Sequence, residues 1–548
     1  MSIRGFRPVR VRTGVLLSAL LLGSGSLVSA SANVNPITSI DVQILEGQLQ
    51  EGWYRPSLLQ VNFGRIAEDG RQISDEYECK ELGNGDCGYG FNLKFSYSAT
   101  VVYPPCLESL DGPCIEKFEL RQGDGEWEEA SYIRSIFAPT RNAEPSLGFP
   151  KAGSMSLWRS KSTPHAGGEK TYAIYVLSEG SASAAQQTQL AGVKARIIPF
   201  TEVPGEFPEQ KFSPSKDVIV NGVNYGKRIT TSQFEPFSVW SDRLGKGIVA
   251  EWSKETSARL TLRVPSRFNG WIGGRFSNVD FDLQNYSRSL NRLKISGAPV
   301  SIAEVQLSIP IKDIPQKLRE IYPIKDPPEI AGYFLGGATH KISSRVLEAI
   351  RDYSKDRATR SRTFWGFESV VAGSNKCLSD SSRIVGFVST NALTYMNTAP
   401  SFEDGRLKYS VAGMHFDEKG EVIKGNYDLV LRSDAARCLY GFTDAPVDAV
   451  VSVTYGDKEE SIATSVVGEK NGWLFVSAKN FTFSSPTIEV ALSQPKTTPS
   501  TSPTPISEKT TVSSKPLVKK TIICMKSSTK KKITGYSPKC PKGYTKKS

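Results

Sequence analysis

Histidine is scarce in this chain, with three among 548 residues, at His165, His340 and His415. None begins an HExxH pattern, and the cysteines show no CxxC spacing that would hold zinc. No histidine has a partner at local spacing, so we interpret each as a surface or packing residue and not as a general base. The sequence therefore indicates no metal site and no cofactor.

Other catalytic patterns are also missing. The chain has no Walker loop and no GxSxG elbow, which argues against a P-loop enzyme and a typical α/β-hydrolase. Gly83, Gly85 and Gly88 form a GxGxxG string, but no helix follows it, so we predict a hairpin turn there. We assign no catalytic residue, and a non-catalytic role is favoured over an enzymatic one.

The first 32 residues resemble an export signal. Four arginines in the first twelve residues are followed by an apolar run at 15–22 and by an A-x-A site at 30–32. We predict a signal peptide at 1–32 cleaved near Ala32, so that the mature protein is secreted or attached to the cell surface. An uncleaved N-terminal anchor is the alternative. No later segment approaches 18 apolar residues.

The eight cysteines fit an oxidising compartment. They fall into neighbouring pairs, two of which bracket turn-forming runs. Eight cysteines allow 105 connectivities, so the pairing is a hypothesis. The predicted structural disulfides are Cys79–Cys87, Cys106–Cys114, Cys377–Cys438 and Cys524–Cys540.

Strand patterns dominate the body of the chain. Apolar and polar residues alternate with a period of two at 91–103, 260–264, 447–455 and 488–492. Short strands separated by turn signals favour a mainly β fold of several β-sandwich-like domains. We predict two helices, at about 313–322 and 343–357, the second with an apolar face.

These patterns suggest seven segments. After the signal peptide we predict an N-terminal β domain at 33–204, a middle β domain at 205–335 and a helical connector at 336–370. A β-sandwich at 371–495 follows; its cysteine spacing resembles an immunoglobulin bridge, but Trp473 lies outside the pair. A disordered linker rich in Pro, Thr and Ser at 496–518 leads to a basic, disulfide-stapled hairpin at 519–548.

Positive charge is concentrated at the end of the chain. The net charge is +12, yet residues 33–495 hold 51 basic and 55 acidic side chains, while residues 496–548 hold 13 lysines and one acid. A slightly acidic body argues against a nucleic-acid partner. A tethered lysine-rich tail favours an anionic cell-wall polymer or a membrane surface. A tail that only confers solubility is the alternative. The predicted polyanion-binding residues are Lys519, Lys520, Lys530, Lys531, Lys532 and Lys542.

Two stretches carry a family resemblance. The run 521–524 with 539–544, and the run 427–434 with 437–442, are similar to the C-terminal third of uncharacterised secreted and cell-surface proteins of freshwater actinobacteria. The resemblance implies an exported surface protein and implies no mechanism.

We therefore expect an exported, non-catalytic protein with a structural, adhesive or ligand-binding role. A carbohydrate-active protein, either a glycan-binding module or a glycoside hydrolase, is the alternative, and a secreted inhibitor or toxin-like protein is a weaker one. Trp271 is the candidate glycan-stacking ring because its small neighbours would leave it exposed, although a core position is the competing interpretation. The acid pairs at 280/282 and 128/129 are candidates for two-carboxylate chemistry, with solvation as the simpler interpretation.

Overall fold

The structure of the protein is a computed structural model. It describes residues 39–46, 58–66, 72–78, 96–106, 112–135, 143, 148–183, 186–202, 217–220, 223–227, 243–244, 247–267, 270–322, 332–336, 340–372, 374–380, 383–396, 398–442, 448–455, 458–461, 466–483, 487–493, 520–526, 529–535, 540 and 544–547. The chain divides into two compact units, Met1–Pro495 and Lys496–Ser548, and each is treated by itself.

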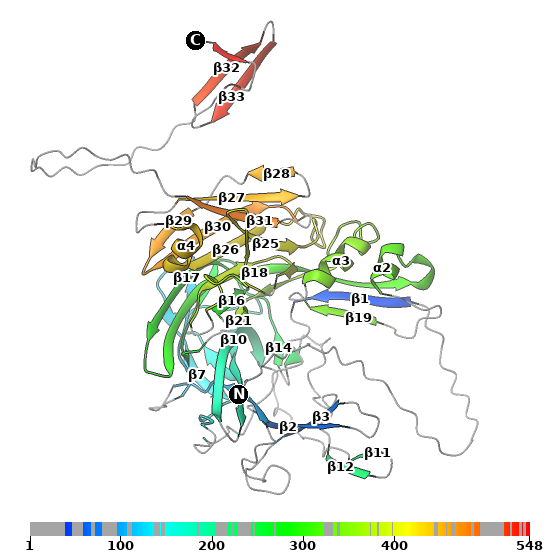
Figure 1. The fold of residues 1–548 in the computed structure, drawn as a ribbon, viewed down its shortest axis with the longest axis vertical. Helices are drawn as coiled ribbons and strands as arrows, with labels where there is room; N and C mark the ends of the chain where they lie inside the picture. Colours follow the sequence, from blue (N-terminus) through cyan, green and yellow to red (C-terminus); the bar gives the residue numbers. More distant parts are fainter. Residues whose placement is uncertain are drawn as a thin grey trace, which may run out of the picture. The chain divides into compact units, whose positions relative to one another are not determined.

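The fold is mainly β, as the alternating pattern predicts. The first unit holds three large sheets and one hairpin (Figure 1). The eight-stranded sheet consists of β1 (Ser39–Leu45), β5 (Cys114–Gln122), β6 (Glu128–Glu129), β15 (Thr256–Pro265), β17 (Phe276–Asn285), β18 (Leu290–Pro310), β19 (Gly332–Gly336) and β20 (Arg360–Phe364).

A larger sheet of fifteen strands lies against it. It consists of β2 (Leu58–Ile66), β3 (Gln72–Glu78), β4 (Ser96–Val102), β7 (Ser131–Ser135), β8 (Ser156–Arg159), β9 (Thr171–Ser183), β10 (Gln186–Glu202), β13 (Arg243–Leu244), β14 (Gly247–Val249), β16 (Gly270–Gly274), β21 (Gly366–Val371), β22 (Gly386–Thr390), β26 (Gly425–Arg432), β29 (Val466–Lys470) and β30 (Trp473–Phe481).

The remaining strands of the first unit form smaller groups. A six-stranded sheet consists of β23 (Thr394–Tyr395), β24 (Ser401–Glu403), β25 (Arg406–Ala412), β27 (Asp448–Tyr455), β28 (Lys458–Ser461) and β31 (Thr487–Ser493). A separate hairpin pairs β11 (Asp217–Val220) with β12 (Val223–Lys227). The predicted strands at 260–264, 447–455 and 488–492 are confirmed as parts of β15, β27 and β31. β4 confirms the later part of the predicted strand at 91–103, whose first residues lie outside the described ranges.

Three α-helices and a short 3-10 helix accompany the described strands: η3 (Ile311–Asp313), α2 (Gln316–Ile321), α3 (His340–Ile350) and α4 (Ser433–Tyr440). Both predicted helices exist, but each is shorter than predicted. Helix α3 ends at Ile350, and the chain then runs through a turn in which Lys355 and Asp356 have positive φ. Helix α4, which carries Cys438, is not predicted by the sequence pattern.

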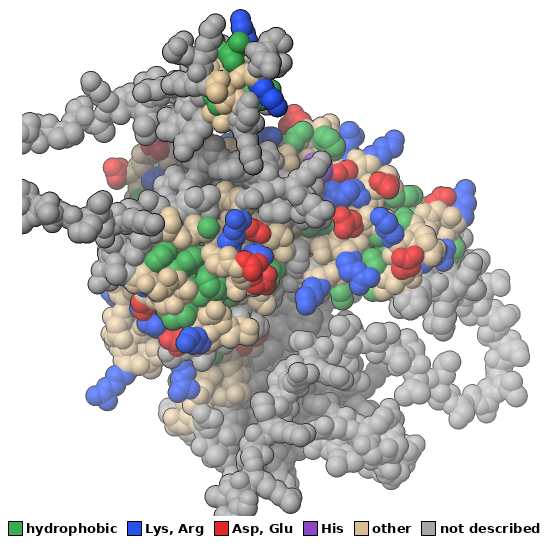
Figure 2. All heavy atoms as spheres, turned by 45° about the horizontal axis from the view of Figure 1, so that its top comes forward, with side chains coloured by type: hydrophobic (Ala, Val, Ile, Leu, Met, Phe, Trp, Pro, Cys, Tyr) green, Lys and Arg blue, Asp and Glu red, His purple; other side chains and the backbone are tan. Residues whose placement is uncertain are grey.

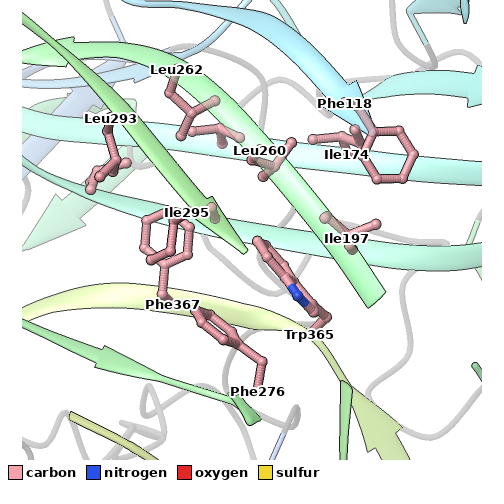
Figure 3. Close-up of a cluster of buried hydrophobic side chains, with 14 of the residues drawn as sticks. Phe118, Ile174, Ile197, Leu260, Leu262, Phe276, Leu293, Ile295, Trp365 and Phe367 are labelled. Carbon is pink, nitrogen blue, oxygen red and sulfur yellow. The ribbon is translucent and has the colours of Figure 1, made fainter. Parts of the chain in front are cut away.

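The largest hydrophobic core lies between the eight-stranded and fifteen-stranded sheets (Figure 3). Leu260 and Leu262 of β15 and Leu293 of β18 face side chains such as Ile174 and Ile197 from the opposite sheet. Alternate residues of these strands enter the core, since successive side chains of a strand point to opposite faces.

The fifteen-stranded sheet packs on both of its faces where β26 runs through it. Val430 belongs to the first core, whereas Tyr427, Leu429 and Leu431 belong to a second core shared with β25, β27 and β31. A strand covered on both faces should read as a continuous apolar run, and residues 427–431 of β26 do so except at Asp428. A third core joins β1 and β18 to helices α2 and α3, which lie beside them in Figure 1.

The sheets cross the predicted domain boundaries. The fifteen-stranded sheet takes β10 from the predicted segment 33–204, β16 from 205–335 and β22 from 371–495. Residues of these three segments also share the first core. The contact-based boundary between Pro495 and Lys496 falls where the Pro/Thr/Ser-rich stretch begins.

The second unit is a three-stranded antiparallel sheet. β32 (Lys520–Lys526) is the central strand, between β33 (Thr529–Gly535) and β34 (Thr545–Lys547). The predicted hairpin thus has a third strand.

Candidate functional site

A pocket of about 470 Å³ opens where β17 passes over the β26–β30 pair. Asp428 forms part of its floor and is 5% exposed. The residues at its mouth are exposed and polar, while Phe475 packs against the first core beside the floor. The side chains that define its chemistry are Asn278, Asp428, Phe475, Ser477, Lys479 and Asn480.

Asp428 is placed in the pocket by the alternation of β26. It shares a face with Val430, so it points toward the first core at the point where that core ends. Burial raises the pKa of the Asp428 carboxyl, and nearby Ser477, Lys479 and the Asn278 N–H offset part of the rise. A carboxyl with a raised pKa keeps its proton to higher pH, and in that form it donates as well as accepts a hydrogen bond.

Two β-bulges shape the pocket. In β17 the register with β18 shifts between Ser277 and Asp280, and Asn278 adopts φ +56°. In β30 the extra residue is Asn480, with φ +66°, because Gly425 pairs with Phe481 and Asn426 with Lys479. Both asparagines line the pocket. Bulges recur next to functional sites, and positive φ in a residue other than glycine marks a position held by its surroundings.

A glycine lies opposite each bulge. A Cβ added at Gly297 would come closer than 3.0 Å to Phe276 and to the Ser277 carbonyl oxygen, and one at Gly425 would collide with the Phe481 ring. Both positions therefore require glycine, because the bulged strand leaves no room for a side chain. The sequence specifies the two bulges through these glycines.

In the pocket, hydrogen-bond donors lie next to hydrogen-bond acceptors. The Asn278 backbone N–H donates to Asp428 Oδ2 at 3.1 Å, and Lys479 Nζ donates to Asn278 Oδ1. Ser477 lies directly across the strand pair from Asp428. Its hydroxyl is shielded from water beside the carboxyl. Together, the polar groups of the pocket can accept hydrogen bonds from a small polar ligand and donate hydrogen bonds to it.

A second pocket, of about 360 Å³, lies among loops near Pro113 and Pro150. Its charged side chains, Arg267 and Arg288, are exposed. It has no buried acid or base among its described lining residues, so it is the weaker candidate.

The prediction of Trp271 as a glycan-stacking ring is corrected by its burial. The side chain is 1% exposed, and its Nε1 donates to the Leu378 carbonyl oxygen at 2.9 Å. The small neighbours that suggested an exposed ring instead let the chain pack onto it, since a Cβ at Gly386 would overlap the indole. Trp271 is a core residue, the competing interpretation of the sequence.

Two histidines have described side chains. His165 is 2% exposed; its Nδ1 accepts from the Gly167 N–H and its Nε2 lies 3.2 Å from the Phe200 carbonyl oxygen, so it is a packing residue. Burial lowers the pKa of His165. His415 Nδ1 lies 2.5 Å from Asp356 Oδ2, and Arg351 bonds the other carboxylate oxygen. The side chain of His340 lies outside the described residues.

The acid pairs do not converge. Asp280 pairs with Lys470 at 2.9 Å on the surface, and Asp282 accepts from Gln284. Glu128 is held by both Ser160 and Ser162. Partial burial raises the pKa of Glu128, but hydrogen bonds from these serines and from backbone N–H groups outweigh it and lower the pKa to about 2. Such a carboxylate anchors a loop and makes a poor proton donor.

The described disulfides match the predicted pairing. Cys106–Cys114, Cys377–Cys438 and Cys524–Cys540 have Cα–Cα distances of 5.3, 5.8 and 5.6 Å, within the normal range. Cys79 and Cys87 lie outside the described residues, as do Gly83, Gly85 and Gly88. Disulfides of this kind fit an extracellular protein.

The predicted polyanion-binding lysines gather on the small sheet of the second unit. Lys520 is in β32, and Lys530, Lys531 and Lys532 are in β33. Lys519 and Lys542 lie outside the described residues.

Two further searches cover the described residues. No three His, Cys, Asp or Glu side chains among them gather as metal ligands. Within the same residues, no helix has the length and apolar character needed to span a bilayer.

The sequence patterns that identify catalytic groups do not identify the pocket residues. One feature of the sequence points to the site: Asp428 is an acid inside the otherwise apolar run 427–431. Comparison with models of known protein families, with curated proteins and with solved structures finds no match to this chain.

Proposed function

We propose that the protein is exported and held at the cell surface by its second unit, which binds an anionic polymer of the wall. The first unit then serves as a structural or ligand-binding body displayed outside the cell. The observation that carries the proposal is the density of lysines on the small, disulfide-stapled sheet.

The strand register places lysines side by side across the central strand. Lys532 and Lys547 pair with Ile523, and Lys531 and Lys546 pair with Cys524. Neighbouring strands are about 4.8 Å apart, so the Cα atoms of each pair of lysines are separated by roughly 10 Å. Positive charges carried so close together repel one another, and a bound polyanion would offset that repulsion.

The disulfide supplies stability that so small a sheet lacks. Three short strands bury little apolar surface, and domains of this size usually depend on cross-links. Cys524 is completely buried, whereas Ile523 on the opposite face is 44% exposed. The face bearing Ile523 is therefore the one open to a partner.

The described residues of the first unit carry charges of both signs. On the face shown in Figure 2, basic and acidic side chains of the described residues are intermixed. Its ion pairs, such as Lys117–Glu129 and Lys470–Asp280, compensate many of these charges locally. Attachment through the second unit would leave the first unit free for other contacts.

Export is supported by three described disulfides and by the signal-like N-terminal pattern. The similarity of the C-terminal third to exported actinobacterial surface proteins agrees with the same proposal.

Direct binding tests the attachment. Full-length mature protein and a version ending at residue 518 are titrated with poly(glycerol phosphate) teichoic acid and, separately, with anionic vesicles. We expect the full chain to bind the polymer, the shorter chain to lose binding, and the affinity to fall steeply with salt.

Matched substitutions separate a specific module from general charge. Replacing Lys530, Lys531 and Lys532 by Gln should weaken binding strongly, while Gln at the exposed body positions Lys254, Lys376 and Lys419 should not. Equal effects of the two triple variants would defeat the proposal. Binding to vesicles but not to the polymer would move the partner to the membrane.

A further inference from the structure

We infer that the pocket around Asp428 binds one ring of a neutral sugar, whose adjacent hydroxyls are shared between the Asp428 carboxyl and the Lys479 ammonium. This site lies within the first unit and does not depend on the proposed attachment function.

The two bulges converge on the pocket from different sheets. Asn278 and Asn480 belong to strands of different sheets, yet both adopt positive φ and both line the same pocket. The fold alone does not require two such residues in one place. A bulge changes the direction of side chains locally, and here both changes put amide groups at the mouth of the pocket.

Asp428 is a polar group at the floor of the pocket, and the residues around it are mostly apolar. A buried carboxylic acid among core residues costs folding free energy unless its hydrogen bonds are satisfied. Asp428 has the Asn278 N–H on Oδ2 and lines the pocket. A ligand with a hydroxyl group would give the carboxyl a further hydrogen bond.

The side chains of the pocket favour one class of ligand over the others. An anionic ligand would meet the Asp428 carboxyl, and a cationic ligand would meet Lys479 at the mouth. An apolar ligand would give the carboxyl and the amides no further hydrogen bonds. A sugar hydroxyl both donates and accepts, which matches this mixed set.

The size and the apolar wall agree with this class. A volume of about 470 Å³ falls in the range of roughly 300–1,000 Å³ found for small-molecule sites. Phe475 and Val279 line the pocket and are only partly buried against the first core. They provide the apolar surface that the C–H face of a sugar ring contacts. Burial also raises the pKa of Asp428, which favours a carboxyl able to donate.

The test uses the full mature chain and methyl glycosides of glucose, galactose, mannose and N-acetylglucosamine, followed by saturation-transfer NMR and titration. We expect at least one glycoside to bind. Asp428→Ala should weaken that binding by at least about tenfold, since it removes the carboxyl and its hydrogen bonds to the ligand. Asp282→Ala, the same change on β17 outside the pocket lining, should leave it unchanged.

Lys479→Met provides a second variant that tests the same site. Lys479 is exposed, so its replacement should preserve the fold while weakening binding several-fold. The inference is overturned if none of the four glycosides binds, or if Asp428→Ala and Lys479→Met bind as the unchanged protein does. Loss of binding in the chain ending at residue 518 would place the sugar on the second unit and would also overturn it.

Discussion

Arg275 and Glu46 are 229 residues apart in the sequence and form a buried ion pair, with 2.5 Å between Nη2 and Oε2. Their side chains are 4% and 3% exposed. Arg196 contacts the other Glu46 oxygen at 3.3 Å, and the Glu46 N–H donates to Glu304. Glu46 follows β1, whereas Arg275 follows β16, so the cluster fastens the eight-stranded sheet to the fifteen-stranded sheet.

Removing one member of this cluster should be costly. Glu46→Gln leaves two buried guanidinium groups without their carboxylate, and we expect the free energy of unfolding to fall by about 3–5 kcal/mol. Glu129→Gln, which breaks the exposed pair with Lys117, should change it by less than about 1 kcal/mol. Denaturant titration measures both. Similar losses in the two variants would contradict a structural role for the buried cluster.

Glu128 should make the stability depend on acid. Its folded-state pKa of about 2 lies below the ordinary value of 4.5. The stabilisation is therefore present above about pH 4.5 and is lost as the pH falls toward 2. In Glu128→Gln we expect a loss of about 2 kcal/mol at pH 7 and a smaller difference from the unchanged protein at pH 3. Thermal melts at the two pH values check this. A difference that is constant with pH would refute it.

Asp428 should make the stability depend on pH in the direction opposite to Glu128. Its raised pKa means that the folded state favours the protonated carboxyl, so stability falls as the pH rises through the folded-state pKa. Asp428→Asn should therefore raise the free energy of unfolding at pH 8, with little change at pH 3. Lys479 is the charged group facing this carboxyl in the pocket. A destabilised Asn variant at pH 8 would show that Asp428 serves the fold and not a ligand.

The disulfides should rank by the length of chain they close. Cys377 and Cys438 are 61 residues apart, and Cys106 and Cys114 are 8 apart. In the loop-entropy estimate the first contributes roughly 4 kcal/mol and the second roughly 2–3 kcal/mol. Replacing both cysteines of one pair by Ser, one pair at a time, should lower the free energy of unfolding in that order. The reverse order in denaturant titration would contradict the estimate.

Local patterns in the sequence predict the parts of this fold that depend on local chemistry. Strand alternation identifies β15, β27 and β31, because one face of each strand is apolar. Turn residues between Cys106 and Cys114 identify that disulfide. Helix α4 is not predicted from the sequence, because its eight residues are too few to show a helical period.

The pocket and the burial of Trp271 depend on contacts between residues far apart in the sequence, so local patterns do not predict them. Asn278 and Asp428 are 150 residues apart and meet through a bulge in β17. A bulge breaks the period of two that reveals a strand, so the residues it re-aims cannot be assigned from alternation. The exposure of Trp271 likewise depends on Gly386, a neighbour supplied by parallel pairing of β16 with β22.

Fractionation of producing cells tests attachment through the second unit most directly. The account predicts that the full-length chain stays with the cell surface and is released by molar salt, while the chain ending at residue 518 appears in the medium. Retention of both chains at the surface, or retention of the full chain that salt does not alter, would contradict it.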